Sequence, residues 1–187
     1  MHGGKALTGD TEVGGARRGS RWRVASWGTA AALILLPLLA MQVTDEVDWD
    51  LADFAFAGAL LVGVGVTYEL AARMTASRAY RAAVGVALGA AFILVWMNLA
   101  VGIIGTEDDS ANLMYGGVLA VGIVGAICAR FQPHGMARAL VATALAQALV
   151  AVIALIAGLG FTGPITVCFA ALWLISAWLF RKAAREP

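Results

Sequence analysis

The fold is decided by a stretch that reads Asp50-Leu-Ala-Asp-Phe-Ala-Phe-Ala-Gly-Ala-Leu-Leu-Val-Gly63, because a close counterpart follows later in the chain. The counterpart reads Asp109-Ser-Ala-Asn-Leu-Met-Tyr-Gly-Gly-Val-Leu-Ala-Val-Gly122 and aligns with the first stretch without a gap. Each copy begins with an acid and then runs apolar for about one bilayer thickness. The two stretches therefore predict a membrane element that the chain uses at least twice.

The similarity continues beyond these two stretches into the arginines that follow each of them. The alignment shifts by two residues and the match then resumes, so that Arg73 corresponds to Arg130 and Arg81 to Arg138. Each copy then turns and runs apolar again, which is typical of a helical hairpin. We interpret residues 50–81 and 109–138 as tandem hairpin repeats of the same orientation, related by an axis along the membrane normal.

The composition excludes most water-soluble folds. The 187 residues are 61% hydrophobic and only 13% charged, whereas soluble domains are about half apolar and a quarter charged. The apolar segments approach or reach the roughly 20 residues that cross a bilayer as a helix, and no alternating β-barrel pattern is present. The sequence predicts an all-α integral membrane protein with six transmembrane helices, in the segments Trp27–Val43, Phe54–Glu69, Ala82–Ile104, Leu113–Cys128, Ala139–Gly158 and Ile165–Phe180.

The charges indicate how the helices are oriented. Acids gather between residues 45 and 53 and between 107 and 109, and every Lys and Arg falls in the alternate segments. Because positive loops face the cytoplasm, both termini are expected to be cytoplasmic. Residues 1–16 are Gly-rich and patternless and are interpreted as a disordered cytoplasmic tail, which leaves 17–187 as the transmembrane domain.

Glycines at regular helical spacing are candidates for close helix packing. Gly85 and Gly89 have the GxxxG spacing that lets another helix approach. Aligned glycines of the two repeats predict a shared packing position. The candidates are Gly58, Gly63, Gly65, Gly85, Gly89, Gly117 and Gly122.

Polar side chains within apolar segments are the candidates for function, since each is costly in a membrane. Glu69 lies on a small-residue face and has two interpretations: a proton or cation site, or an ordinary ion pair with Arg73 four residues later. Asn98 and Gln147 are expected to point into the bundle, where each is either a helix-to-helix hydrogen-bonding group or part of a solute site.

Motifs for other chemistry are missing from the sequence. It contains no HExxH, CxxC, phosphate-binding loop or nucleophile triad in a suitable context, so we expect no enzyme activity, no cofactor, no metal centre and no nucleic-acid partner. The clustered acids supply oxygen ligands that suit a hard cation, but they lack EF-hand spacing.

Four segments together resemble a group of small multi-pass bacterial inner-membrane proteins that has no assigned activity. They are Thr44-Asp-Glu-Val-Asp-Trp-Asp-Leu-Ala-Asp-Phe54, Gly65-Val-Thr-Tyr-Glu-Leu70, Asn98-Leu-Ala-Val-Gly-Ile-Ile-Gly105 and Ala129-Arg-Phe-Gln-Pro-His-Gly-Met-Ala-Arg138. The resemblance implies a location in the bacterial inner membrane and transfers no catalytic residue.

Two functions remain open at this point. The first is a non-catalytic accessory or structural subunit, whose partners are the lipid bilayer and other integral membrane subunits or a second copy of itself. The second is a small solute or cation/proton transporter or channel that uses Glu69, Asn98 and Gln147.

Overall fold

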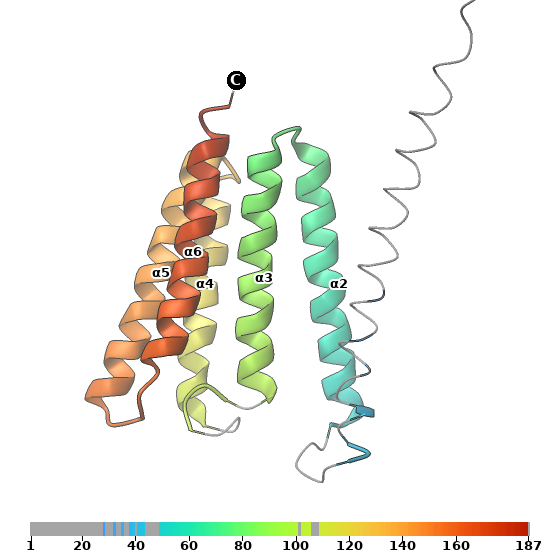
Figure 1. The fold of residues 1–187 in the computed structure, drawn as a ribbon, viewed down its shortest axis with the longest axis vertical. Coiled ribbons are helices and arrows are strands. Elements are labelled where there is room, and N and C mark those ends of the chain that lie inside the picture. Colours follow the sequence, from blue (N-terminus) through green and yellow to red (C-terminus); the bar gives the residue numbers. More distant parts are fainter. Residues whose placement is uncertain are drawn as a thin grey trace, which may run out of the picture. The chain divides into compact units, whose positions relative to one another are not determined.

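The computed structural model describes residues 49–100, 102–105 and 109–186, together with positions 28, 32, 35, 38, 39 and 41–43. Within these residues the protein is all-helical and has no strand (Figure 1). The elements are α2 (Leu51–Met74), α3 (Arg78–Ala100), the short 3-10 helix η1 (Ser110–Asn112), α4 (Leu113–Cys128), α5 (Pro133–Ile156) and α6 (Gly163–Ala183).

Five of the helices are long and apolar enough to cross a membrane: α2, α3, α4 with η1, α5 and α6. The predicted first helix, Trp27–Val43, and the tail 1–16 lie wholly or mostly outside the described residues, so the count of six stays a prediction. The chain divides into two compact parts, Met1–Leu61 and Val62–Pro187, and the boundary falls within α2.

In the first part, the start of α2 is fixed by a carboxylate cap. Asp50 Oδ1 accepts hydrogen bonds from the backbone N–H groups of Ala52 and Asp53, at 2.7 and 3.0 Å. In return, the side chain of Asp53 accepts the N–H of Asp50 at 2.9 Å. This reciprocal arrangement satisfies donors that a helix N-terminus leaves free, and its negative charges suit the positive end of the helix dipole.

In the second part, α3–α6 run side by side (Figure 1). Helix α6 packs against both α3 and α5, and α5 also packs against α4. The inward face of α6 repeats at spacings of four and three residues, which keeps one stripe of a helix turned toward its neighbours. The buried residues of this repeat are Thr162, Thr166, Phe169, Trp173, Ser176, Phe180 and Ala183.

Antiparallel contacts set the depth of these helices relative to one another. The Ser176 hydroxyl donates to the carbonyl of Ala83 at 2.7 Å, and the rings of Tyr80 and Phe180 meet edge to face with centroids 5.0 Å apart. The Tyr80 hydroxyl also donates to the carbonyl of Phe131 at 2.8 Å. Tyr80 therefore ties α6 and the α4–α5 turn to the first turn of α3.

The two ends of this part differ in charge. We call the end with residues 75–77, 129–132 and 184–186 the basic end, and the end with 102–105, 109–112 and 157–162 the acidic end. Every described Lys and Arg lies in α2's last turn or near the basic end, while Asp109 lies at the acidic end. The cations of this part are thus segregated in space as they are in the sequence, whereas the acids Glu69 and Glu186 also lie near the basic end.

The predicted end of the third segment needs correction. We expected it to continue through Ile104 to Gly105, but α3 ends at Ala100. Gly102 and Gly105 have φ angles of 66° and 65°, which turn the chain in a way that glycine tolerates best. The Asn112 side chain then binds this loop: its Oδ1 accepts from Ile103 N and Ile104 N at 3.0 and 2.9 Å. Its Nδ2 donates to Ile104 O at 3.0 Å.

The start of α5 also differs from expectation. The fifth segment was predicted to begin at Ala139, yet α5 begins at Pro133, and Gly135 lies in its first turn. The reversal falls on Arg130 and Phe131, which have φ angles of 48° and 58°. Proline suits a first helical position because it has no N–H to leave unpaired.

Of the seven glycines predicted to mediate helix packing, two lie close to a side chain of another helix among the described atoms. A Cβ placed at Gly85 would contact the Tyr68 ring at 3.4 Å, and one at Gly122 would lie 3.2 Å from the Thr143 hydroxyl. The other five predicted glycines, Gly58, Gly63, Gly65, Gly89 and Gly117, have nothing within 4 Å among the described atoms. At Gly125 and Gly135, which were not among the predicted glycines, a Cβ would lie 2.7 Å from the Cβ of Ala139 and 2.6 Å from the Cβ of Ala129.

Candidate functional site

Glu69 and Arg73 form an ion pair on the surface of α2. The Arg73 Nε donates to Glu69 Oε1 at 2.8 Å, and the side chains are 59% exposed for Glu69 and 74% for Arg73. The pair lies within one helix, so neither group draws another helix into contact through it. An exposed pair of this kind contributes little to stability.

Asn98 lies near the acidic end of α3 and bonds to its own helix. Its Nδ2 donates to the Leu94 carbonyl at 2.8 Å, and its Oδ1 is buried without a partner among the described residues. Asn98 is about 30 Å along α3 from Arg78. Glu69 lies in the last two turns of α2, next to the α2–α3 turn, whereas Asn98 lies at the far end of α3 from that turn, so the two side chains do not share a site.

Gln147 is the most enclosed of the predicted candidates. It is 0% exposed, and neither its Nε2 nor its Oε1 has a hydrogen-bond partner among the described residues. It faces inward from α5 together with Thr143 and Ala144. The structure thus keeps Glu69 with Arg73, and separates both from Asn98 and from Gln147.

Other polar groups on α4 and α6 and in the α5–α6 turn are also buried and were not selected from the sequence. Buried polar atoms without a partner within the described protein are Tyr115 Oη, Thr162 Oγ1, Thr166 Oγ1 and Trp173 Nε1. The hydroxyls of Tyr115 and Thr162 lie close together, although they do not form a well-oriented hydrogen bond. We call the set Tyr115, Gln147, Thr162, Thr166 and Trp173 the polar seam.

The polar seam is energetically expensive. A buried donor or acceptor that lacks a partner costs about 1–3 kcal/mol. In lipid, burying apolar surface between helices supplies no hydrophobic gain to offset that cost. The sequence held a signal for the seam, because Thr166 lies four residues after Thr162 and Trp173 lies seven residues after Thr166. Isolated Thr and Trp in apolar helices are, however, too common to point to a site.

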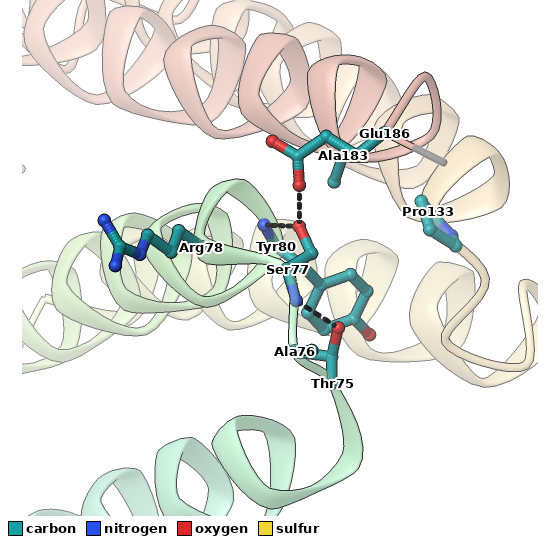
Figure 2. Close-up of a pocket in the computed structure, with 8 residues that line it drawn as sticks. All are labelled: Thr75, Ala76, Ser77, Arg78, Tyr80, Pro133, Ala183 and Glu186. Carbon is teal, nitrogen blue, oxygen red and sulfur yellow. Dashed lines mark hydrogen bonds between the residues drawn. The ribbon is translucent and has the colours of Figure 1, made fainter.

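A cavity of about 570 Å³ opens at the basic end (Figure 2). Its lining joins the α2–α3 turn, the start of α5 and the end of α6: Thr75, Ala76, Ser77, Arg78, Tyr80, Pro133, Ala183 and Glu186. The Ser77 hydroxyl donates to Glu186 Oε2 at 2.6 Å and accepts the N–H of Tyr80 at 3.0 Å. Ser77 therefore caps α3 and holds the chain after α6, while Arg78 extends away from Glu186 (Figure 2).

Among the described residues, no three His, Cys, Asp or Glu side chains gather in a way that could hold a metal ion. The acids Asp45, Glu46, Asp48, Glu107 and Asp108 lie outside those residues, so the expectation that they bind no metal stays a prediction.

The part of the chain that the structure describes defines a class of protein: it is all-helical and has five helices long and apolar enough to span a membrane, one exposed ion pair and one enclosed polar seam. No protein-family model, no curated protein and no solved structure matches the chain.

Proposed function

We propose that the protein is a non-catalytic, multi-pass protein of the bacterial inner membrane that packs against other membrane proteins as an accessory or structural subunit. The observation that carries the proposal is the open face of α2 in its second half. Val62, Val66 and Leu70 are 61%, 52% and 55% exposed, and Gly65 beside them has nothing within 4 Å of its Cβ position. A glycine between exposed aliphatic side chains lets a partner helix approach closely.

The docking role predicts a site-specific crosslink. A photo-crosslinking side chain at Val62 in the full chain, expressed in bacterial membranes, is expected to capture a second polypeptide. The same side chain at Leu149 is the matched control, because that residue is 58% exposed on α5 but has no neighbouring glycine. Capture should disappear when Gly65→Leu fills the notch. Adducts with lipid alone at both positions, or with residues 27–43 of the same chain, would contradict the docking role.

The proposed topology has six helices with the basic end and both termini in the cytoplasm. It predicts the labelling of single cysteines by an impermeant maleimide in intact cells, after Cys128 and Cys168, which are both exposed, are replaced by serine. Ser110→Cys and Phe161→Cys should react, whereas Ala76→Cys should react only after the cells are opened. Labelling of Ala76→Cys in intact cells would reverse the orientation.

The repeat of hairpins 50–81 and 109–138 is part of the same proposal. Two hairpins of one orientation require the turns after α2 and α4 to be on the same side of the membrane. Gln132→Cys must therefore label as Ala76→Cys does. Opposite labelling of these two positions excludes the repeat.

The alternative, a small solute or cation/proton transporter or channel that uses Glu69, Asn98 and Gln147 together, has less support. Glu69 is exposed and paired within its own helix, and Asn98 lies near the opposite end from it. A shared ion site needs these side chains to converge at one depth.

A further inference from the structure

The polar seam follows one line through the bundle. Thr162, the residue before α6, and Thr166 on α6 lie at the acidic end. Trp173 lies near the middle of α6, and Ser176 lies closer to the basic end. All belong to the inward face with the spacing of four and three residues. Below Ser176 the line reaches Tyr80, which lines the cavity at the basic end. Polar groups therefore recur along the inner face of α6 from the acidic end to Ser176, with Phe169 among them, and Phe180 lies between Ser176 and Tyr80.

Neighbouring helices add polar groups at matching depths. Gln147 is about 14 Å from the α5–α6 turn and Trp173 about 15 Å from it, on two helices that pack against each other. The Tyr115 side chain on α4 leans toward the start of its helix, as long helical side chains do, and its hydroxyl lies close to Thr162 at the acidic end. Three helices thus contribute to the seam.

The chemistry of the seam is uncharged and mixed. It presents donors at Trp173, both donors and an acceptor at Gln147, and hydroxyls at Tyr115, Thr162 and Thr166. No carboxylate, guanidinium or amine is among them, so nothing in the seam offsets the cost of stripping water from an ion. Each of its unpartnered atoms is almost fully enclosed, which describes a closed, tightly packed arrangement.

We propose that the polar seam is the closed form of a passage for small uncharged hydrogen-bonding molecules, of which water is the smallest. When the helices part, molecules entering beside Thr162 satisfy the unpartnered hydroxyls and then the Gln147 amide at mid-depth. They then pass the ring of Phe180 and leave through the cavity lined by Tyr80 and Ser77. The passage goes beyond the docking role of α2 and does not depend on it. The unpaired atoms raise the free energy of the closed form and so favour a populated open form.

The test is stopped-flow light scattering on liposomes that contain the full chain. Wild-type protein is expected to raise osmotic water permeability several-fold above protein-free liposomes, and to raise urea permeability as well. Gln147→Leu should return both to the protein-free value. Glu69→Gln is the control, because that side chain is exposed on α2 and should leave permeability unchanged. Potassium flux should stay at the protein-free value throughout.

Two results in this assay would overturn the passage. One is wild-type permeability equal to that of protein-free liposomes, and the other is full permeability in Gln147→Leu. If Glu69→Gln rather than Gln147→Leu abolishes transport, the pathway follows α2 and the proposal also fails.

The thermal stability of a Gln147 variant tests the proposal without a transport assay. If the amide is unpartnered in the closed form, Gln147→Met, which keeps the volume and removes the polar atoms, should raise Tm by a few degrees. Thr143→Val is the control, because its hydroxyl donates to the Ala139 carbonyl at 2.9 Å and is already satisfied. A fall in Tm for Gln147→Met would mean that the amide has partners in the closed form, and would overturn the proposal.

Discussion

Replacing Asn112 with alanine is expected to destabilise the protein by about 3 kcal/mol, the largest effect among single polar substitutions in the described chain. The side chain holds three backbone groups of the loop after α3, the N–H groups of Ile103 and Ile104 and the carbonyl of Ile104. Ile104 is 1% exposed, so its freed backbone groups have little access to water. Each buried group left without a partner costs about 1–3 kcal/mol.

The measurement is reversible unfolding in mixed detergent micelles, with two matched variants. Asn112→Asp keeps an acceptor for the two N–H groups but loses the donor to Ile104, so it should fall between wild type and Asn112→Ala. Asn98→Ala removes the only bond that the Asn98 side chain donates, the one to the Leu94 carbonyl of its own helix, and should cost about 1 kcal/mol or less. Equal losses for Asn98→Ala and Asn112→Ala would show that the loop is not held by Asn112.

Asn112 also explains why the sequence did not predict the residue at which α3 ends. Long apolar runs were sufficient to predict the helices α2 to α6, because length and hydropathy decide membrane spans. The end of α3 was placed too late because the run stays apolar through Ile103 and Ile104. What ends the helix is a side chain eight or nine residues away, together with two glycines at positive φ. A tertiary contact of this kind leaves no local pattern in the sequence.

The candidate site was predicted unevenly for a related reason. Glu69 was a candidate because a carboxylate within an apolar segment is unusual. Its significance depends on which way the helix faces, and the structure places it on an exposed surface beside Arg73. Thr162, Thr166 and Trp173 are ordinary residues one at a time. They form a seam only because α6 turns one face toward both α3 and α5, and that arrangement comes from packing.

The close approach of α4 and α5 gives the second large effect: Gly125→Ala is expected to destabilise the protein by about 1–2 kcal/mol. A Cβ at Gly125 would lie 2.7 Å from the Cβ and 3.2 Å from the Cα of Ala139, and neither atom can rotate away. Overpacking of this kind costs about 1–3 kcal/mol, while glycine to alanine in a helix returns up to about 1 kcal/mol.

A second substitution and a control separate the clash from helix propensity. Ala139→Gly should restore most of the stability lost in Gly125→Ala, because it removes the atom that the new methyl group meets, and the two changes should be strongly non-additive. Gly117→Ala on the same helix meets nothing within 4 Å and should leave stability unchanged or raise it by up to about 1 kcal/mol. If Gly125→Ala and Gly117→Ala stabilise the protein equally in the same unfolding assay, α4 and α5 do not touch at Gly125. Gly122 and Gly125 are the positions at which α4 comes close to α5, and they set the depth of Tyr115 relative to α5. Without these contacts, Tyr115 would have no structural basis as part of the polar seam.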